Sequence, residues 1–189
     1  MTKKILVLDG HSGESTFCRA LAIKAAQGAK DTGHDVRLMH MSQMPFDPIL
    51  KDDQEQEPAL KSFQENLTWC DHFVLVHPLW WGSPPAKLKG LFDRSLLPDF
   101  AYRYEEGKTL PQKLLAGRSA TVLVTCDTPS WYLRFVYGAG WQKIIKRQIL
   151  GFCGFSPVRF LSIGPVHSST LKKREKWLSQ AHAIGHATR

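Results

Sequence analysis

Five short apolar runs, separated by longer segments with helical spacing, are the feature that most limits how this chain can fold. The runs occupy residues 4–8, 35–40, 73–77, 119–125 and 158–163. The first, Lys4-Ile-Leu-Val-Leu8, has four consecutive apolar residues after its lysine, which is typical of a parallel strand buried on both faces. Strands that alternate with helices predict an α/β fold, with a five-stranded parallel sheet and helices on both faces.

Helical periodicity fills the intervals between these runs. We expect helices from Phe17 to Gly33, from about Gln54 to Trp69, from Ala86 to Leu97, from about Tyr132 to Phe152 and from Leu171 to about Ala183. Gly33 supplies a stop for the first helix, and Gly138 and Gly140 interrupt the fourth. Two prolines predict a loop over residues 44–48.

Length and composition restrict the class of protein. A chain of 189 residues with 43% hydrophobic residues suits one domain over residues 1–189 and excludes disorder. Its apolar runs are far shorter than the roughly 18 residues that cross a membrane. Only four apolar residues follow the first lysines before Asp9, too few for a signal peptide. We therefore expect a cytoplasmic protein with no membrane insertion.

The four cysteines and the net charge point to no metal and no nucleic acid. Cys18, Cys70, Cys126 and Cys153 form no Cys-x-x-Cys pair or zinc-like cluster, so we expect buried, unreactive thiols. The formal charge is +8, but the lysines and arginines are scattered apart from residues 172–174, and no RNA-binding motif accompanies them. The positive charge has two remaining explanations, which are binding of an anionic ligand and a basic surface without a binding role.

Ligands of parallel α/β sheets bind outside the carboxyl ends of the strands. The first of these loops, residues 9–16, contains two glycines and three hydroxyls but matches neither dinucleotide nor P-loop patterns. Backbone N–H groups at the following helix start, with Ser12, Ser15 and Thr16 nearby, could surround a phosphate. The simpler alternative is an ordinary helix cap made by Ser15 or Thr16.

The loop after the third run is more distinctive. Trp80 and Trp81 follow a buried strand directly and cannot both point into one core, while Gly82 and Ser83 leave amides accessible. Such a loop could hold a flat heteroaromatic ring, although tryptophans packed on a neighbouring helix are the alternative. Farther along, we expect Lys87, Lys89 and Arg94 to form a solvated helix face.

At this point the residues suggest a family. The segment from Pro78 to Arg94, followed by Phe100-Ala-Tyr102, resembles the NAD(P)H:quinone oxidoreductases with a flavodoxin-like fold. His11 with Thr16-Phe17, Thr125, and Phe152-Cys-Gly-Phe155 match in the same order. The resemblance covers essentially the whole chain and implies the strand order 2-1-3-4-5. Some proteins that resemble this family are ancillary subunits of potassium efflux systems.

The resemblance implies a flavin site, with FMN or FAD as cofactor and NAD(P)H as co-substrate. Its cofactor-binding residues would be His11, Thr16, Phe17 and Cys18 at the phosphate end, Pro78, Leu79, Trp80, Trp81 and Gly82 at the ring, and Thr125, Cys126 and Asp127 at the pyrimidine end. Such a site fits the chemistry of a flavin, which needs an anion site, a flat apolar slot and hydrogen-bond donors beside the ring.

The sequence also departs from the family. Where members carry a Thr-Thr-Gly-Gly run, this chain reads Thr125-Cys-Asp-Thr-Pro129, and an inward Asp127 would disfavour anionic reduced flavin. Many members use a tyrosine and a histidine in catalysis. Tyr132 matches the tyrosine, whereas Tyr137 stands where the histidine is expected.

Two functions follow from the resemblance. The first is flavin-dependent transfer of a hydride from NAD(P)H and two-electron reduction of a quinone. The alternative is a regulatory flavoprotein of a potassium efflux system, with weak or no reductase activity. The family also implies a homodimer with shared active sites. We expect five loop and helix-face aromatics to supply its interface. They are Phe100, Tyr102, Tyr104, Trp131 and Trp141.

Overall fold

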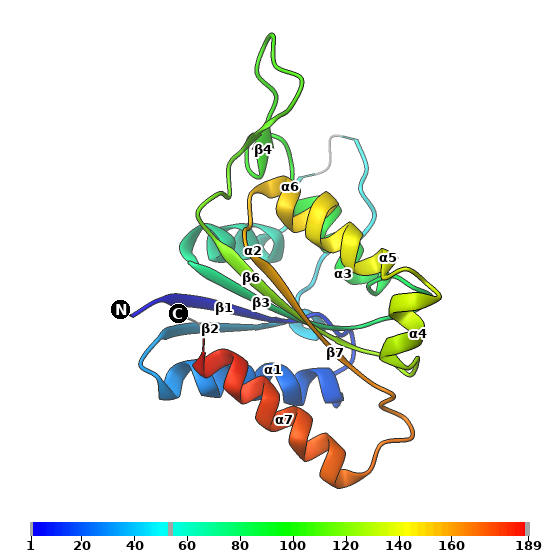
Figure 1. Ribbon diagram of the computed structural model, residues 1–189. Coiled ribbons are helices and arrows are strands. Elements are labelled where there is room, and N and C mark those ends of the chain that lie inside the picture. The colour runs from blue at the N-terminus through cyan, green and yellow to red at the C-terminus, as the bar shows by residue number, and fades with distance from the viewer. Residues whose placement is uncertain (1, 53–54, 188–189) are drawn as a thin grey trace.

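The computed structural model describes residues 2–52 and 55–187 and is organised around a parallel five-stranded sheet (Figure 1). Its strands are β1 (Lys4–Asp9), β2 (Asp35–His40), β3 (His72–Pro78), β6 (Ser119–Thr125) and β7 (Val158–Ile163). Their order in the sheet is β2-β1-β3-β6-β7, and every neighbouring pair is parallel. The predicted α/β fold and the order 2-1-3-4-5 are thus confirmed, since β4 and β5 lie outside this sheet.

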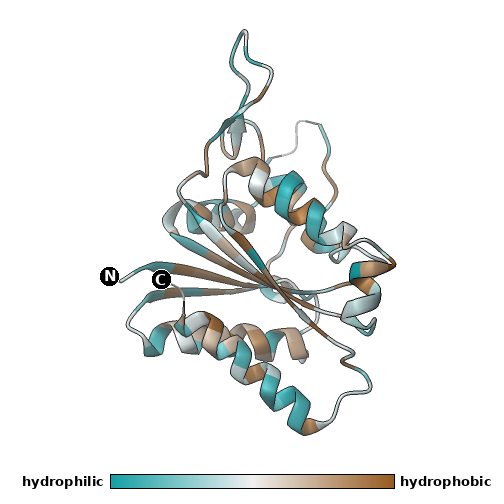
Figure 2. Ribbon diagram, viewed as in Figure 1, coloured by the Kyte–Doolittle hydropathy of each residue, from teal (hydrophilic) through white to brown (hydrophobic). Residues whose placement is uncertain are grey.

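Helices cover both faces of the sheet (Figure 1). One face carries α1 (Phe17–Asp31) and α7 (Leu171–His186); the other carries α2 (Pro58–Trp69), α3 (Ala86–Ser95) and the run α5 (Gly140–Lys143), η2 (Ile144–Leu150) and α6 (Gly151–Cys153). Short elements complete the chain: η1 (Met41–Gln43) and α4 (Ser130–Phe135). Alternate residues of β1 enter two separate hydrophobic cores, one beneath each helical layer, and Figure 2 shows the apolar strands between them.

The helices α1 and α7 approach each other closely because glycine stands at their contact. A Cβ atom at Gly28 would lie 2.0 Å from the carbonyl oxygen of His182, and one at Gly185 would lie 1.9 Å from that of Ala25. These distances are far below van der Waals contact. The small residues of α1 therefore let α7 pack backbone to backbone.

Two helical expectations need correction. The predicted helix that starts near Gln54 begins at Pro58, and Gln54 itself lies outside the described residues. The predicted helix over residues 132–152 is divided after α4, because Gly138 and Ala139 adopt positive φ values of 60° and 51°. Left-handed residues cannot continue a right-handed helix, so the chain turns there and restarts at α5.

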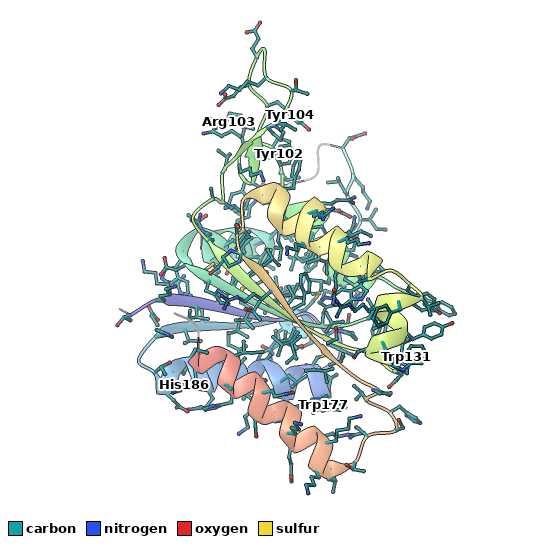
Figure 3. All side chains as sticks on the ribbon, in the orientation of Figure 1. Tyr102, Arg103, Tyr104, Trp131, Trp177 and His186 are labelled. Atoms are coloured by element: carbon teal, nitrogen blue, oxygen red, sulfur yellow. The ribbon has the colours of Figure 1, made fainter. Side chains whose placement is uncertain are left out.

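A small antiparallel hairpin, β4 (Tyr102–Arg103) paired with β5 (Gln112–Lys113), projects from the top of the molecule in Figure 1. Sequence analysis did not predict it, because two-residue strands carry no periodic signal. Figure 3 shows Tyr104 on this projection, where its side chain is largely exposed.

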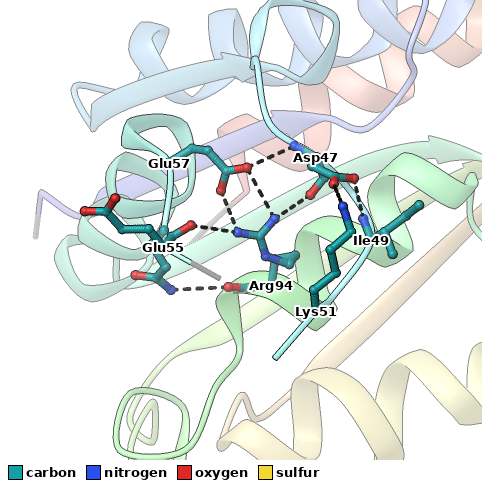
Figure 4. Close-up of polar contacts among 7 residues, drawn as sticks. Asp47, Ile49, Lys51, Glu55, Glu57 and Arg94 are labelled. Carbon is teal, nitrogen blue, oxygen red and sulfur yellow. Dashed lines mark hydrogen bonds and ion pairs between the residues drawn. The ribbon is translucent and has the colours of Figure 1, made fainter. Parts of the chain in front are cut away.

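Arg94 was wrongly expected on a solvated face. Its side chain is 2% exposed, and its guanidinium donates to both carboxylate oxygens of Glu57, at 2.6 and 3.3 Å (Figure 4). It also donates to the carbonyl oxygens of Asp47 and Glu55. The residue thus fastens the long loop between β2 and α2 to α3. Lys87 is also engaged, since its ammonium donates to two carbonyl oxygens around η1, and Lys89 alone is exposed as expected.

The aromatic residues expected at an interface divide into three groups. Trp141 is buried, with 4% of its surface exposed, and belongs to the core beneath α5. Phe100 and Tyr102 are partly buried against the same core. Tyr104 and Trp131 are largely exposed, on the hairpin and on α4 respectively (Figure 3). The expectation that Trp141 lies on the surface is therefore wrong, because the turn before α5 directs that helix toward the sheet.

Candidate functional site

Two neighbouring cavities lie at the carboxyl edge of the sheet, where parallel α/β proteins bind their ligands. The smaller has a volume of about 220 Å³ and is lined by His11, Thr16, Phe17, Cys18, Pro78, Leu79, Trp80, Thr125, Cys126, Asp127 and Val166. The larger has a volume of about 1040 Å³ and is lined by Leu79, Trp80, Trp81, Gly82, Cys126, Asp127, Thr128, Leu133, Tyr137, Gly140, Trp141 and Ile144. Because four residues line both, the cavities form one groove. All twelve candidate cofactor-binding residues line it.

The start of α1 forms one end of this groove. Thr16 caps the helix, since its hydroxyl accepts from the amide of Arg19 at 3.1 Å. The amides of Phe17 and Cys18 follow the cap and have no acceptor within the helix by its geometry. No acidic residue occupies the first turn, so the positive end of the helix dipole is unopposed there. The cap and the anion site are therefore compatible features of one helix start.

Hydrogen bonds hold the loop before α1 in shape. The amide of His11 donates to the buried carboxylate of Asp9 at 3.2 Å, and the amide of Gly13 donates to the His11 Nδ1 atom at 2.8 Å. The other Asp9 oxygen lies 3.2 Å from the Nδ1 atom of His40. The His11 ring meets the edge of Trp80 at a centroid distance of 5.3 Å. The first and third loops therefore form one continuous wall.

A tight turn presents the two tryptophans. The backbone of Trp80 and that of Ser83 exchange two hydrogen bonds, at 2.9 and 3.0 Å, and these bonds do not use the amides of the two residues between them. Trp81 and Gly82 adopt φ values of 51° and 73°. Positive φ is uncommon for a bulky residue and marks strain that often accompanies function. Trp81 is also fully exposed, so the alternative in which both tryptophans pack on a neighbouring helix is wrong.

The loop after β6 closes another side of the groove. Asp127 points its Oδ1 atom at the amide of His167, at a distance of 2.6 Å, and is largely exposed. The amide of Val166 donates to the carbonyl oxygen of Cys126, and a Cβ atom at Gly164 would lie 2.4 Å from that oxygen. These contacts pull the loop after β7 against the loop after β6. Val166 thereby becomes a cavity wall, which no motif in its own loop predicted.

The two tyrosines expected in catalysis differ in position. Tyr137 lines the larger cavity, whereas Tyr132 lines neither cavity. Their rings meet edge to face at a centroid distance of 5.0 Å, so Tyr132 supports Tyr137 from behind. The division of the predicted helix at Gly138 explains this arrangement, because it brings Tyr137 back over the groove.

The floor of the larger cavity contains unpaired polar atoms. Trp141 lines this cavity, and its indole Nε1 atom has no hydrogen-bond partner among the described residues. Below it, the fully buried His77 places its Nδ1 atom 2.8 Å from the carbonyl oxygen of Pro78, and burial lowers its pKa to about 4. A neutral imidazole that donates from Nδ1 keeps Nε2 as an acceptor. The Trp141 Nε1 and His77 Nε2 atoms are both buried beneath the cavity surface and have no partner among the described residues, which is rare for buried polar atoms.

Both thiols beside the groove are protonated at neutral pH. Burial raises the pKa of the Cys18 thiol to about 12 and raises that of Cys126 as well. Cys126 makes a hydrogen bond to the carbonyl oxygen of Thr128. These cysteines therefore act as small apolar wall residues and supply no nucleophile.

Comparison with known proteins identifies the family. Residues 3–184 match the sequence profile of a protein family that is described as having a flavodoxin-like fold. The chain belongs to this flavodoxin-like family. Residues 3–184 of this flavodoxin-like protein contain every strand of the main sheet and every residue that lines the groove.

Named relatives of this flavodoxin-like protein include oxidoreductases. It is 27% identical over 174 residues to an uncharacterized NAD(P)H oxidoreductase of Haemophilus influenzae, with 88% of this chain and 85% of that protein covered. It is 31% identical over 121 residues to an FMN-dependent NADH:quinone oxidoreductase of Nitratidesulfovibrio vulgaris, with 63% and 56% covered. The crystal structure of Smu.1420 from Streptococcus mutans superimposes with a TM-score of 0.82 at 28% identity, covering 97% of this chain and 98% of the other.

Proposed function

We propose that this flavodoxin-like protein is a flavin-dependent NAD(P)H:quinone oxidoreductase that uses FMN. The observation that carries the proposal is the groove itself. It joins an anion-accepting helix start, an apolar slot flanked by tryptophans and a turn with unused amides, within one continuous surface. Relatives named as NAD(P)H oxidoreductase and FMN-dependent NADH:quinone oxidoreductase support this reading.

The residues present fit a flavin mononucleotide. The amides of Phe17 and Cys18, with the Thr16 hydroxyl, suit its phosphate without a lysine. The walls of Leu79 and Trp80 suit a flat ring, and the amides of Trp81 and Gly82, which the turn between Trp80 and Ser83 does not use, offer donors beside it. A bound flavin would supply a two-electron carrier that accepts a hydride from NAD(P)H and delivers it to a quinone.

The protein's own contribution is positional and electrostatic. The groove holds two flat molecules in succession against one face, which raises their effective concentration and excludes water from the contact. Tyr137 lines the larger cavity beside this face, so we assign its hydroxyl to hydrogen bonding with the acceptor oxygen during reduction. Tyr132 acts as a positioning residue because its ring supports that of Tyr137.

Asp127 is compatible with this chemistry. Its Oδ1 atom is occupied by the His167 amide and its side chain is largely exposed, so solvent screens its charge. The carboxylate still lines both cavities, and it therefore opposes build-up of negative charge on a reduced ring to a modest extent.

We also propose a homodimer that works in the cytoplasm. The exposed Tyr104 on the projecting hairpin and an apolar groove along α3 and η2 supply a surface suited to a second copy. This groove is lined by Leu50, Lys89, Phe92, Asp93, Leu96, Leu97, Pro98, Tyr102, Ile144, Gln148, Ile149, Phe152 and Cys153. Within the described residues, no helix is long and apolar enough to cross a membrane.

The test is purification followed by release and mass measurement of any bound cofactor, together with NAD(P)H oxidation in the presence of a water-soluble quinone. We expect FMN at one per chain and turnover that requires both substrates. A chain that neither retains nor takes up flavin overturns the proposal. Bound flavin without turnover overturns the enzymatic role and favours the regulatory alternative.

A further inference from the structure

An exposed aromatic surface surrounds the mouth of the larger cavity. We call it the aromatic rim and define it by Trp81, Trp131, Phe135, Val136 and Tyr137, all of which are largely exposed. Trp131 contacts the ring of Tyr132, which contacts Tyr137, and Tyr137 and Trp81 line the same cavity. The exposed rings on α4 thus connect to the cavity that Trp81 borders from the other loop. Soluble proteins seldom expose so much connected apolar surface without a binding role.

Exposure of a large apolar side chain to water is unfavourable, and it is most pronounced at Phe135 and Trp81. Phe135 is 75% exposed on α4, where the helix could have turned it toward the sheet. Trp81 combines full exposure with a positive φ, so it bears backbone strain and gains no packing in return. Figure 3 shows Trp131 at the outer edge of α4, directed away from the sheet. The rim thus faces outward in the free protein.

The excess positive charge of the chain lies in the sequence segment that contains most of this rim. Residues 128–174 contain no Asp or Glu and carry Arg134, Lys143, Lys146, Arg147, Arg159, Lys172, Lys173 and Arg174. Since eight of the 25 Lys and Arg residues lie in this segment, the other 17 match the 17 Asp and Glu residues of the rest of the chain. The net charge of +8 therefore equals the charge of residues 128–174, of which Arg134, Lys172 and Lys173 lie on the side of the molecule that carries α4 and the start of α7 (Figure 1).

One of these cations contacts the rim, and two others lie on the same side of the molecule. Arg134 lies within it, with its guanidinium 5.6 Å from the ring centroid of Phe135. Lys172 and Lys173 are exposed at the start of α7, which Figure 1 shows on the same side of the molecule as α4. Leu171, also largely exposed, begins that helix. Apolar rings and cations are thus presented together along one edge.

We propose that the aromatic rim and its bordering cations dock this protein on an anionic phospholipid surface. Aromatic side chains favour the interfacial zone of a bilayer, and Lys and Arg residues beside them are attracted to anionic headgroups. A second copy is a poorer occupant, because a symmetric contact between two rims would bring the Arg134 guanidinium of one copy toward that of the other.

The position of the rim links docking to the acceptor. When the protein is docked at this edge, the larger cavity opens toward the lipid. A quinone dissolved in the bilayer then reaches the groove without crossing water. This part of the inference rests on the proposed function, whereas docking itself does not. The contact is peripheral, since the described residues contain no helix that could cross the bilayer.

The test compares vesicles of phosphatidylcholine alone with vesicles that also contain phosphatidylglycerol, using co-sedimentation and tryptophan emission. We expect binding to the anionic vesicles that weakens as salt is added. Trp131→Ser/Phe135→Ser should reduce vesicle affinity about tenfold. Lys172→Glu/Lys173→Glu should reduce it at least roughly 25-fold, since each cation near the surface contributes about fivefold.

Matched controls carry the same chemical changes elsewhere. Ile23→Ser/Leu110→Ser removes two exposed apolar side chains from α1 and the hairpin loop, and Lys24→Glu/Lys61→Glu reverses two exposed cations on α1 and α2. Both should bind vesicles like the unmodified chain. Equal binding to both vesicle types, or rim variants that behave like the controls, would overturn the proposal.

Two further measurements separate the alternatives. If Trp131→Ser/Phe135→Ser lowers the sedimentation mass without lipid, the rim is a contact between copies and the proposal is overturned. Turnover with a water-soluble quinone tests the proposed function independently and should be unchanged in both rim variants. Loss of soluble-quinone turnover in the unmodified protein would count against the enzyme and not against docking.

Discussion

The thiol of Cys18 lies 3.2 Å from the hydroxyl of Thr125. This contact joins the first turn of α1 to the last residue of β6, between residues that are 107 positions apart in the chain. It forms part of the wall of the smaller cavity, where both residues are buried. The helix start that suits a phosphate is therefore held against the strand end that borders the same cavity.

This burial makes the thiols unreactive. The pKa is raised to about 12 for Cys18 and Cys70 and to about 11 for Cys153, mainly because burial disfavours the thiolate. We expect less than one thiol per chain to react with a disulfide reagent at pH 8 in the native protein, and all four cysteines to react in urea. A thiol that reacts rapidly before unfolding would contradict the buried arrangement.

Comparison of the two threonine helix caps separates an effect on FMN binding from an effect on stability. Thr16 caps α1 beside the groove, and Thr170 caps α7 by accepting from the amide of Lys173. Replacement of either by Ala should lower the free energy of unfolding by about 1 kcal/mol. Only Thr16→Ala should also weaken FMN binding, measured by titration of flavin fluorescence. Equal FMN affinity in the two variants would remove the helix start from the proposed site.

Asp127 should influence the reduction potential of bound flavin. Removal of its charge in Asp127→Asn favours the anionic reduced ring, so the midpoint potential should rise by about 20 mV, equivalent to about 1 kcal/mol for a two-electron couple. Asp93→Asn changes the same charge on α3, where Asp93 pairs with Lys89, and serves as the control. An unchanged potential in Asp127→Asn would show that the carboxylate does not sense the ring.

His77 should make stability depend on pH. Burial lowers its pKa from 6.5 to about 4 in the folded chain, so the unfolded chain binds this proton more tightly. Its contribution is fully present above pH 6.5 and is lost as the pH falls toward 4, by about 2 kcal/mol between pH 7.5 and 5. Urea unfolding at the two pH values should show that His77→Asn loses about 2 kcal/mol less unfolding free energy between pH 7.5 and 5 than the unmodified protein does. The same loss in both proteins would contradict a buried neutral imidazole.

The buried pair of Arg94 and Glu57 should matter more than an exposed pair. Arg94→Ala leaves two carbonyl oxygens without their donor and leaves the partly exposed carboxylate of Glu57 with the Asp47 amide, which should cost about 2–3 kcal/mol of unfolding free energy. Arg103→Ala breaks the exposed pair with Asp99 and should cost less than about 1 kcal/mol. Chemical denaturation measures both. Similar losses in the two variants would show that burial does not set the strength of the pair.

Patterns near in sequence predicted much of the site. The turn formed by Trp80, Trp81 and Gly82 and the helix start at Thr16 each lie within one loop, so their residue types could be interpreted directly. The contribution of Val166 could not, because it depends on the contact between two loops about 40 residues apart. The sequence also could not show which of Tyr137 and Tyr132 lines the larger cavity, since this depends on how the chain turns at Gly138.

The alternation of strands and helices, and hence the parallel sheet and the edge at which a ligand can bind, could be predicted from the amino-acid pattern. These properties follow from local periodicity and from the covering that both faces of a parallel sheet require. The burial of Arg94 and Trp141 and the exposure of Trp131 could be learned only from the folded chain. Burial depends on which distant segments meet, and hydrophobic periodicity within one element does not specify them.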